Sequence, residues 1–293
     1  MVFACVILRS EITDNYGSRI ETAQPNVTDN YVITKRIKKF IRKGLRQAHH
    51  WAWIANGHFG RIISINTPDK FTVIIPSYNI ERVCNITPQV NSILKCDFVE
   101  IIIVSNHNPK LILEDWVKFD DEHLKLINQQ IHRGCGYGWI VGINTKSEFI
   151  VVIDDDLLIV PNQLAFLFMQ LIEQREIPHG LIGSYNTKYY LNHGMEVDNL
   201  YEIYAVTQTH LKKYLELVQK ITARGYASHE SIEFWGDDII ISNTGEGKPW
   251  IHDAGPLLRC PTATQPGVAT YLKADFQPKR AKVRKALESV LST

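Results

Sequence analysis

Short apolar runs and longer amphipathic segments alternate along most of this chain. Largely apolar runs occupy 71–75, 99–104 and 149–153, and each is followed by polar residues. Runs of this kind are typical of strands buried on both faces, as in parallel sheets covered by helices. The alternation therefore predicts an α/β fold of the Rossmann-like kind, with a mixed, mostly parallel sheet flanked by helices.

The spacing of apolar residues also predicts the remaining elements of this domain. We expect a third strand at 124–127, and an irregular, polar and aromatic loop at 186–199. Amphipathic or apolar helical patterns and further apolar runs complete the order. They predict helices at 81–95, 161–172, 209–221 and from 278 onward, and strands at 180–185 and 202–206.

The N-terminal part has a different pattern. Residues 9–31 are polar, and from Ile33 apolar residues recur at helical spacing among seven Lys and Arg side chains, with no acid up to Trp51. This predicts a basic amphipathic helix, which either docks on an anionic membrane surface through residues 33–53, with Trp51 and Trp53 at the interface, or packs on the domain with a solvated basic face. We expect a helical extension over 1–68 and the α/β domain over 69–293.

Composition narrows the class of protein. The net charge is +1, which argues against a protein that coats nucleic acid. Five scattered cysteines without a C-x-x-C pair indicate neither a disulfide framework nor a zinc site. No stretch is long and apolar enough to span a bilayer, and no secretory signal is recognisable. These features predict a cytoplasmic protein, with possible peripheral contact at a membrane surface.

Three adjacent carboxylates, Asp154, Asp155 and Asp156, follow the apolar run 149–153 directly. Carboxylates this close repel one another unless a cation or hydrogen-bond donors share the site. Because Mg²⁺ and Mn²⁺ take oxygen ligands from carboxylates and phosphates, the triplet predicts a divalent metal with a phosphate ligand. Polar residues also end the other two strands, and the carboxyl ends of parallel strands meet at one edge, where nucleotides bind. Neither a P-loop nor a G-x-G-x-x-G turn is present to hold the phosphates, although 134–138 is Gly-rich.

These motifs resemble a known group of enzymes. Segments 74–79, 101–105 and 153–156 are similar to the nucleotide-sugar half of GT-A fold glycosyltransferases, over about residues 70–260. The Asp triplet and the later pair Asp237-Asp238 look most like the exostosin-like group, glycosyltransferase family 64, with family 2 as the near neighbour. Segment 134–143 departs from family 2 because it lacks an Arg-Asn pair.

The resemblance implies roles for individual residues. Asp156 would bind Mn²⁺ or Mg²⁺, with His252 as a late metal ligand, while Asp154 and Asp155 would hold the ribose, the sugar or waters around the metal. Asp238, or its neighbour Asp237, would be the carboxylate beside the anomeric carbon. Candidates for a cation that faces the diphosphate are Arg133, His132 and Lys146, and candidates for stacking on the acceptor are Tyr189, Tyr190 and Tyr201. The base pocket would be lined by Pro76, Ser77, Tyr78, Asn79, Asn106 and Arg133.

The implied function is metal-dependent transfer of a hexose or N-acetylhexosamine from a nucleoside-diphosphate sugar to a glycan or other hydroxyl acceptor. The expected donor is a UDP-sugar. The exostosin-like resemblance implies retention, whereas family 2 implies inversion with Asp238 as general base. Two other classes stay open. A nucleotidyltransferase normally has a Gly-rich basic loop after its first strand, where this chain has residues 76–79. A non-catalytic nucleotide-sugar binder could keep the same fold.

Overall fold

The computed structural model describes residues 61–292 and six positions between Gly44 and Ala55. The chain divides into two compact units, Met1–Gly44 and Leu45–Thr293, and every described residue except Gly44 belongs to the second. The predicted basic helix and Trp53 therefore lie almost wholly outside the described residues, and both interpretations of that helix stay predictions. Within the described part, no helix has the length and apolar character needed to cross a membrane.

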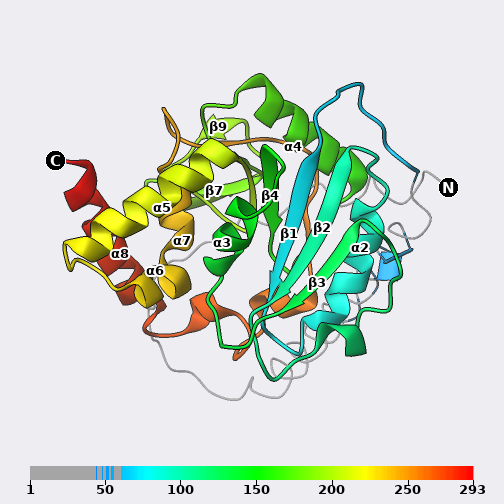
Figure 1. Cartoon of the computed structure of the whole chain (residues 1–293), viewed down its shortest axis with the longest axis horizontal. Coiled ribbons are helices and arrows are strands. Elements are labelled where there is room, and N and C mark those ends of the chain that lie inside the picture. The colour runs from blue at the N-terminus through cyan, green and yellow to red at the C-terminus, as the bar shows by residue number, and fades with distance from the viewer. Residues whose placement is uncertain (1–43, 45–47, 49–50, 53, 56–60, 293) are drawn as a thin grey trace, which may run out of the picture. The chain divides into compact units, whose positions relative to one another are not determined.

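The central sheet of the second unit has eight strands in the order β3-β2-β1-β4-β11-β6-β12-β9. Four neighbouring strands are parallel and lie side by side in Figure 1. Antiparallel β11 then pairs with β4 on one side and β6 on the other. The strands are β1 (Phe71–Ser77), β2 (Val99–Asn106), β3 (Leu124–Asn128), β4 (Phe149–Ile153), β11 (Ile203–Thr207), β6 (His179–Gly180), β12 (Trp250–Ile251) and β9 (Met195–Glu196). The mixed, mostly parallel sheet predicted from the apolar runs is confirmed.

Helices cover both faces of this sheet, because its buried strands carry apolar side chains on both sides. Val73, Ile75 and Val151 contribute to one core with α2 and α4, whereas Ile74 and Val152 contribute to a second core with the other helices. Successive residues of a strand point to opposite faces, so each strand supplies both cores. The helices are α2 (Ile86–Ile93), α4 (Pro161–Glu173), α3 (Tyr137–Ile143), α5 (Gln208–Ala223), α6 (His229–Trp235), α7 (Asp237–Ser242) and α8 (Phe276–Leu291).

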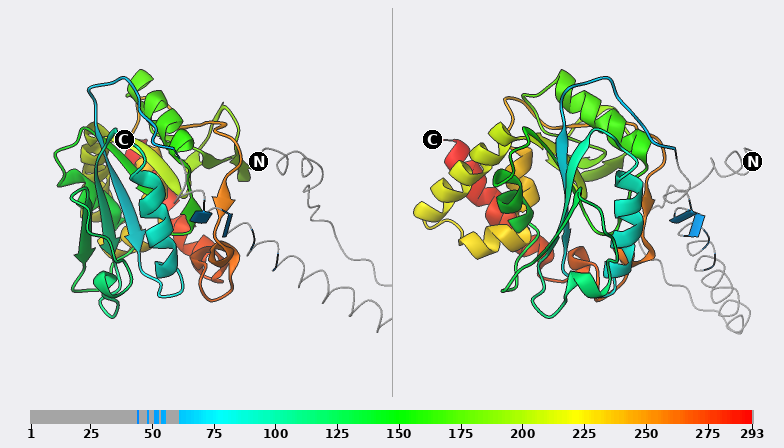
Figure 2. Two further views of the ribbon diagram at one scale, coloured as in Figure 1. Left: turned by 90° about the vertical axis from the view of Figure 1, so that its right-hand side faces the viewer. Right: turned by 45° about the vertical axis from the view of Figure 1, so that its right-hand side comes forward.

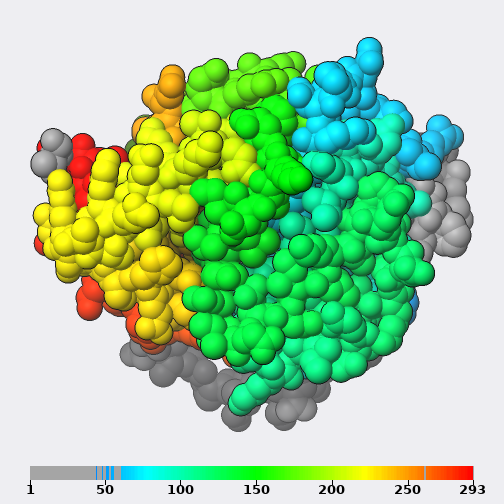
Figure 3. All heavy atoms as spheres, in the orientation of Figure 1, coloured from blue at the N-terminus to red at the C-terminus, as the bar shows by residue number. Residues whose placement is uncertain are grey.

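The two further views show α2 and α4 against the sheet, and the space-filling view shows α5 beside α3 on one face of the molecule (Figures 2 and 3). Four 3₁₀ turns, Val83–Asn85, Leu113–Asp115, Pro261–Thr264 and Thr270–Leu272, connect the larger elements. Segment 61–68 also contacts this domain: Ile63 forms a bridge with Cys96, and Ile65 packs against the core. The predicted domain start near residue 69 is thus preceded by chain that packs on the same unit.

Two expectations about residues 180–199 were wrong. The run 180–185 is divided between β6 in the central sheet and β7 (Ile182–Tyr185) in a separate sheet. Residues 186–199, expected as an irregular loop, contain β8 (Lys188–Leu191), β9 and β10 (Asn199–Leu200). Asn186 and Thr187 both have positive φ, 47° and 66°, and form the two-residue turn between β7 and β8. Such turns favour Asn and Gly, and Thr at the second position hides the hairpin from sequence inspection.

Candidate functional site at the carboxyl edge of the sheet

The acidic triplet lies directly after β4, at the edge where β1 and β2 also end. Ser77 Oγ donates to Asp155 Oδ2 at 2.9 Å, and Arg82 Nη1 lies 3.2 Å from Asp155 Oδ1. Arg82 Nη2 also pairs with Asp156 Oδ2 at 2.8 Å. Asp156 Oδ1 is buried and has no hydrogen-bond partner, and the Asp154 side chain accepts no hydrogen bond from the described residues. The predicted convergence of strand ends is therefore present, with one arginine between two of the three acids.

Helix α2 and the 3₁₀ turn before it fix the backbone of this acidic turn. Gln89 Nε2 donates to the carbonyl oxygens of Asp154 and Leu157 at 2.9 and 2.7 Å. Asn85 Nδ2 donates to the carbonyl oxygen of Asp155 at 3.0 Å. Both amides are buried, and together with Ser92, which donates to the Ile159 carbonyl oxygen at 2.6 Å, they satisfy backbone groups within segment 154–159. The carboxylates thus project from a rigid turn.

Burial raises the pKa values of the three carboxyl groups of the acidic turn. Burial, followed by repulsion from Asp156 and Glu202, raises the pKa of Asp154 well above its usual range. Burial raises the pKa of Asp155 to about 6 even though Arg82 opposes the shift. Glu202, at the start of β11, has its pKa raised to about 8 by burial and by Asp156. The site therefore has more negative charge than its arginines neutralise.

Glu202 is a site residue that the sequence analysis missed. Its backbone has a φ of 62°, and its carbonyl oxygen accepts the Asp154 N–H at 2.8 Å. Its carboxylate pairs with Arg259, whose Nε lies 2.8 Å from Oε2. Arg259 belongs to β13 (Leu258–Arg259), which pairs with β5 (Leu157–Leu158) beyond the acidic turn. A left-handed backbone at a non-glycine residue is common at functional sites, where surrounding contacts maintain it.

The donor atoms at this edge fit a divalent cation. The buried, unpartnered oxygen of Asp156 and the unbonded carboxyl of Asp154 are hard oxygen ligands, and a cation would offset the burial and the repulsion by Asp156 that raise the pKa of Asp154. No group of three or more His, Cys, Asp or Glu side chains in the described residues has the arrangement of a metal site. A metal here would therefore complete its coordination with substrate oxygens and water.

The predicted base-pocket residues lie around the ends of β1 and β2. Tyr78 Oη is 2.6 Å from Thr270 Oγ1, and the Tyr78 carbonyl oxygen accepts from Asn108 Nδ2 at 3.0 Å. Asn79 Oδ1 accepts the N–H of Glu81 at 2.9 Å. Asn106 is fully buried, and its carboxamide organises the loop after β2 through Asn108. Pro76 and Ser77 complete β1 at this edge. Asn106 is thus buried at the end of β2, while Tyr78 and Asn79 directly follow β1.

Arg133 stacks over the ring of Tyr137, with 4.4 Å between its guanidinium carbon and the ring centroid. Its Nη1 lies 3.6 Å from Glu233 Oε2, and the neighbouring Gly134 N–H donates to Glu233 Oε1 at 2.7 Å. Glycines in this segment permit close packing on α6 and α7: a Cβ at Gly136 would lie 2.7 Å from Cβ of Asp237. The Gly-rich segment therefore positions a loop against an acidic helix start.

The two acids at the start of α7 differ in their contacts. Asp238 is buried, and both of its oxygens accept from Arg280 of α8 at 2.6 Å. Asp237 is half-buried: its Oδ2 accepts from Trp139 Nε1 at 3.2 Å, and the backbone N–H of Asp238 also stabilises its carboxylate. Burial and the charge of Asp238 raise the pKa of Asp237 to about 8. Asp238, preferred from the sequence, is thus held in an ion pair, whereas Asp237 is in no ion pair with a described residue.

His252 lies elsewhere on the same edge. β12 is separated from β4 by β11 and β6, so three strand spacings, roughly 14 Å, lie between His252 and the acidic turn. Its Nε2 is 2.9 Å from His179 Nδ1, and the His179 Nε2 donates to the Gln174 carbonyl oxygen at 2.7 Å. The structure does not bring His252 to Asp156. Sequence gives no sign of this, because sheet order is not readable from the order of segments.

The remaining candidates divide between the two edges of the sheet. Lys146 precedes β4 and is exposed at the amino edge, on the opposite side from the acids, which argues against a role at the diphosphate. His132 lies 5.2 Å from the ring of Phe234, next to the loop that carries Arg133. Tyr189 and Tyr201 stack at 5.9 Å between centroids, on the small sheet beside Glu202. Arg82 and Arg259, which sequence reasoning did not select, are the cations nearest the acids.

A mostly parallel α/β sheet covered by helices on both faces, with an acidic turn at the carboxyl edge of β4, is the architecture of a GT-A glycosyltransferase domain. The comparisons agree with this class. The sequence matches glycosyl transferase family 2 over residues 72–227, more than half of the chain. The chain belongs to glycosyl transferase family 2. Support for the exostosin-like assignment is absent from these matches, and the matched region ends before Asp237.

One solved structure is similar in fold at low sequence identity, and a second is similar over a smaller part of the chain. GalNAc-T7, in a structure with UDP, GalNAc and Mn²⁺, superposes with a TM-score of 0.51 at 11% identity, covering 75% of this chain and 48% of that one. TarS of S. aureus, residues 1–349 with UDP, gives a TM-score of 0.44 at 15% identity, covering 64% of this chain and 59% of that one. The chain thus spans about half the length of GalNAc-T7. No curated protein sequence matches it.

Proposed function

We propose that this protein transfers a sugar from a nucleoside-diphosphate sugar, with UDP-sugars as the first donors to test, to a hydroxyl of a glycan acceptor, and that a divalent metal, Mn²⁺ or Mg²⁺, assists the reaction. The observation that carries the proposal is the buried, unpartnered Asp156 oxygen at the carboxyl edge of a family 2 domain. A bound metal would stabilise the charge that develops on the departing diphosphate. Asp156 would hold it, with Asp154 close enough in sequence to contribute.

The protein's own groups prepare this edge for a donor. Arg82 neutralises part of the charge on Asp155 and Asp156, so that a diphosphate can approach acids that would otherwise repel it. Ser77 fixes one Asp155 oxygen, which leaves the turn in one orientation. Tyr78 and Asn79 offer an aromatic ring and an amide for a nucleoside. Arg82 is therefore proposed as a positioning residue for the acidic turn.

Family membership shifts the proposed stereochemistry toward inversion. An inverting transfer needs a base that takes the proton of the acceptor hydroxyl as the oxygen attacks the anomeric carbon. Asp237 supports this role better than Asp238, because it is in no ion pair with a described residue and has a pKa of about 8, whereas both oxygens of Asp238 are held by Arg280. Only its deprotonated form can accept the proton, so the rate should rise with pH and level off above about 8. Analysis of the product distinguishes retention from inversion, and it also shows whether a hexose or an N-acetylhexosamine is transferred.

One experiment tests the proposal. The full chain is incubated with UDP- and GDP-sugars, with Mn²⁺ or Mg²⁺, and release of free diphosphate nucleotide is measured with and without glycan acceptors. We expect release that requires metal, is stimulated by an acceptor and falls 10²- to 10⁴-fold in Asp237→Asn. The anomeric proton of the product, read by NMR, distinguishes inversion from retention. Binding of nucleotide sugar without any turnover would instead identify a nucleotide-sugar binder, and formation of a nucleotide sugar from a sugar phosphate would identify a nucleotidyltransferase.

A further inference from the structure

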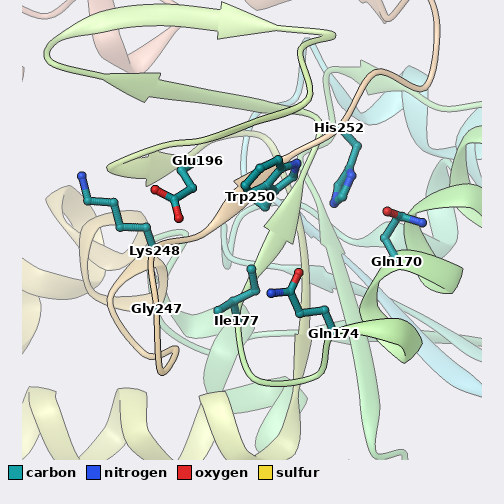
Figure 4. A pocket seen from close by; sticks show the side chains of 8 residues that line it. All are labelled: Gln170, Gln174, Ile177, Glu196, Gly247, Lys248, Trp250 and His252. Atoms are coloured by element: carbon teal, nitrogen blue, oxygen red, sulfur yellow. The ribbon is translucent and has the colours of Figure 1, made fainter.

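A pocket of about 370 Å³ lies beside the outer strands β12 and β9, apart from the acidic turn. Figure 4 shows Trp250 in the middle of it, with Glu196 and Lys248 on one side, His252 and Gln170 on the other, and Gln174 below the indole. Its volume falls in the range of small-molecule sites, and its walls come from several separate segments of the chain. The residues that matter for its chemistry are Gln170, Gln174, Glu196, Lys248, Trp250 and His252.

Trp250 provides an aromatic surface in this pocket. Because neighbouring residues of a strand point to opposite faces, Ile251 is fully buried in the core that α5 and α7 share, while Trp250 and His252 face the pocket. The indole is half-buried, and its Nε1–H donates to no acceptor in the described part of the chain. A half-exposed ring with an unused donor suits a ligand that has both an apolar face and polar groups.

Planar polar groups stand around the ring. Gln174 and Glu196 are exposed, and neither side chain makes a hydrogen bond with another described residue. Gln170 Nε2 donates to Glu173 Oε2 at 3.3 Å, which leaves its carbonyl oxygen available. An amide presents donors and an acceptor side by side, and a carboxylate presents two acceptors. These groups match the paired hydroxyls of a sugar ring.

The charge of the pocket excludes a phosphate or another anion. Lys248 is paired with Asp198 at 3.0 Å and lies 5.0 Å from the centroid of Tyr185, so its charge is already compensated. Glu196 adds a carboxylate to the wall, and burial together with the charge of His179 lowers the pKa of His252 to about 4, so that this imidazole is neutral. The pocket is therefore suited to a neutral ligand with several hydroxyls.

We infer that this pocket binds a neutral pyranose unit of the acceptor glycan, an inference that rests on the proposed function. The strand register gives the distance of this pocket from the transfer site. Trp250 is level with His179, Ala205 and Val151 across the sheet. Three strand spacings, roughly 14 Å, separate it from β4. A glycan of several units can thus occupy both places, whereas a single sugar bound at the transfer site cannot.

Saturation-transfer NMR on the full chain tests this binding directly. The probes are the methyl glycosides of glucose, galactose, N-acetylglucosamine and N-acetylgalactosamine, with glucuronic acid as the charged probe and with saturating UDP and Mn²⁺ to fill the donor site. We expect a saturation-transfer signal from at least one neutral glycoside and none from glucuronic acid. The affinity should fall at least tenfold in Trp250→Ala and in the double variant Gln174→Ala/Glu196→Ala, whose residues are exposed and leave folding intact.

Gln219→Ala/Glu216→Ala, exposed residues of the same types on α5, is the matched control and should bind like the parent protein. If no neutral glycoside gives a saturation-transfer signal, or if the parent protein and the double variant give equal signals, the inference is overturned. Metal-dependent nucleotide release from the donor without acceptor is measured on the same samples. It should be unchanged in the double variant, so failure of the proposed function and failure of this pocket are separate results.

Discussion

The ion pair between Asp238 and Arg280 permits a test that separates stability from catalysis. Arg280 Nη1 and Nη2 lie 2.6 Å from the two Asp238 oxygens, and both side chains are close to fully buried, 11% and 7% exposed. Arg280→Met removes the only side chain that pairs with Asp238 among the described residues. It leaves a carboxylate in an apolar surrounding, next to Asp237, whose charge repels it.

The expected loss of stability is large. Removing one partner of a buried ion pair costs about 3–5 kcal/mol, because the other charge stays buried without compensation. Domains of this kind have about 5–15 kcal/mol in total, so the variant should lose a third or more of its stability. The double variant Asp238→Asn/Arg280→Met leaves no unpaired charge buried at this position, so it should be more stable than Arg280→Met alone. The interaction energy is the loss in the double variant minus the losses in the two single variants, Asp238→Asn and Arg280→Met.

Urea unfolding followed by tryptophan fluorescence provides the measurement, with nucleotide release on the same variants as the second readout. Lys279→Met on the same helix is the control: Lys279 pairs with Asp275 at 2.6 Å, but both side chains are exposed, and exposed pairs contribute little to stability. The reasoning fails if Asp238→Asn keeps full stability but loses transfer, because Asp238 would then be the catalytic base and its contact with Arg280 incidental.

Three further outcomes are expected. Asp156→Ala should raise the Mn²⁺ concentration needed for half-maximal nucleotide release by at least tenfold, and an unchanged titration would place the metal elsewhere. Stability without metal should change by less than about 1 kcal/mol, because the variant loses the contact with Arg82 but also the repulsion among the carboxylates. Burial holds the pKa of His210 at about 4, below the ordinary 6.5, so the unfolded chain binds more protons and this residue costs stability as pH falls from 6.5 to 4. His210→Gln, which keeps a capping-box residue at this position of α5, should therefore gain about 2 kcal/mol at pH 5 relative to pH 8, as measured by urea unfolding at both pH values; equal effects at both pH values would contradict it. Deleting residues 1–44 should leave nucleotide release intact and weaken salt-sensitive binding to anionic liposomes, whereas equal liposome binding would assign the basic segment to packing.

Much of the part of the domain from β1 to the acidic turn after β4 was predictable, because the sequence patterns that indicate it are local. The buried run 149–153 and the acids after it predict both a strand and its ligand edge, and the parallel arrangement brings Ser77 to Asp155. Arg82 was not predictable, because one arginine in a helical segment gives no sign of the acids it meets 73 positions along the chain. Pairings of this kind depend on tertiary structure.

The later half was harder for physical reasons that individual residues show. Two-residue strands such as β6 and β12 have too few positions to reveal a period of two, so the position of His252 could not be derived. An acid at a helix start needs no function, and Asp237 and Asp238 gave the same signal. Only Arg280, from the last helix, distinguishes them.

The insertion of antiparallel β11 next to β4 has a consequence for synthesis of the chain. β4 ends at Ile153, but its neighbour on the open side ends only at Thr207, so roughly 50 residues must be made before that edge is paired. At translation rates of about 5–20 residues per second, the most apolar strand of the nascent sheet stays unpaired on one side for several seconds. Unpaired apolar edges are templates for aggregation. A ribosome-associated chaperone would find its binding segment there, at the strand that later carries the acids.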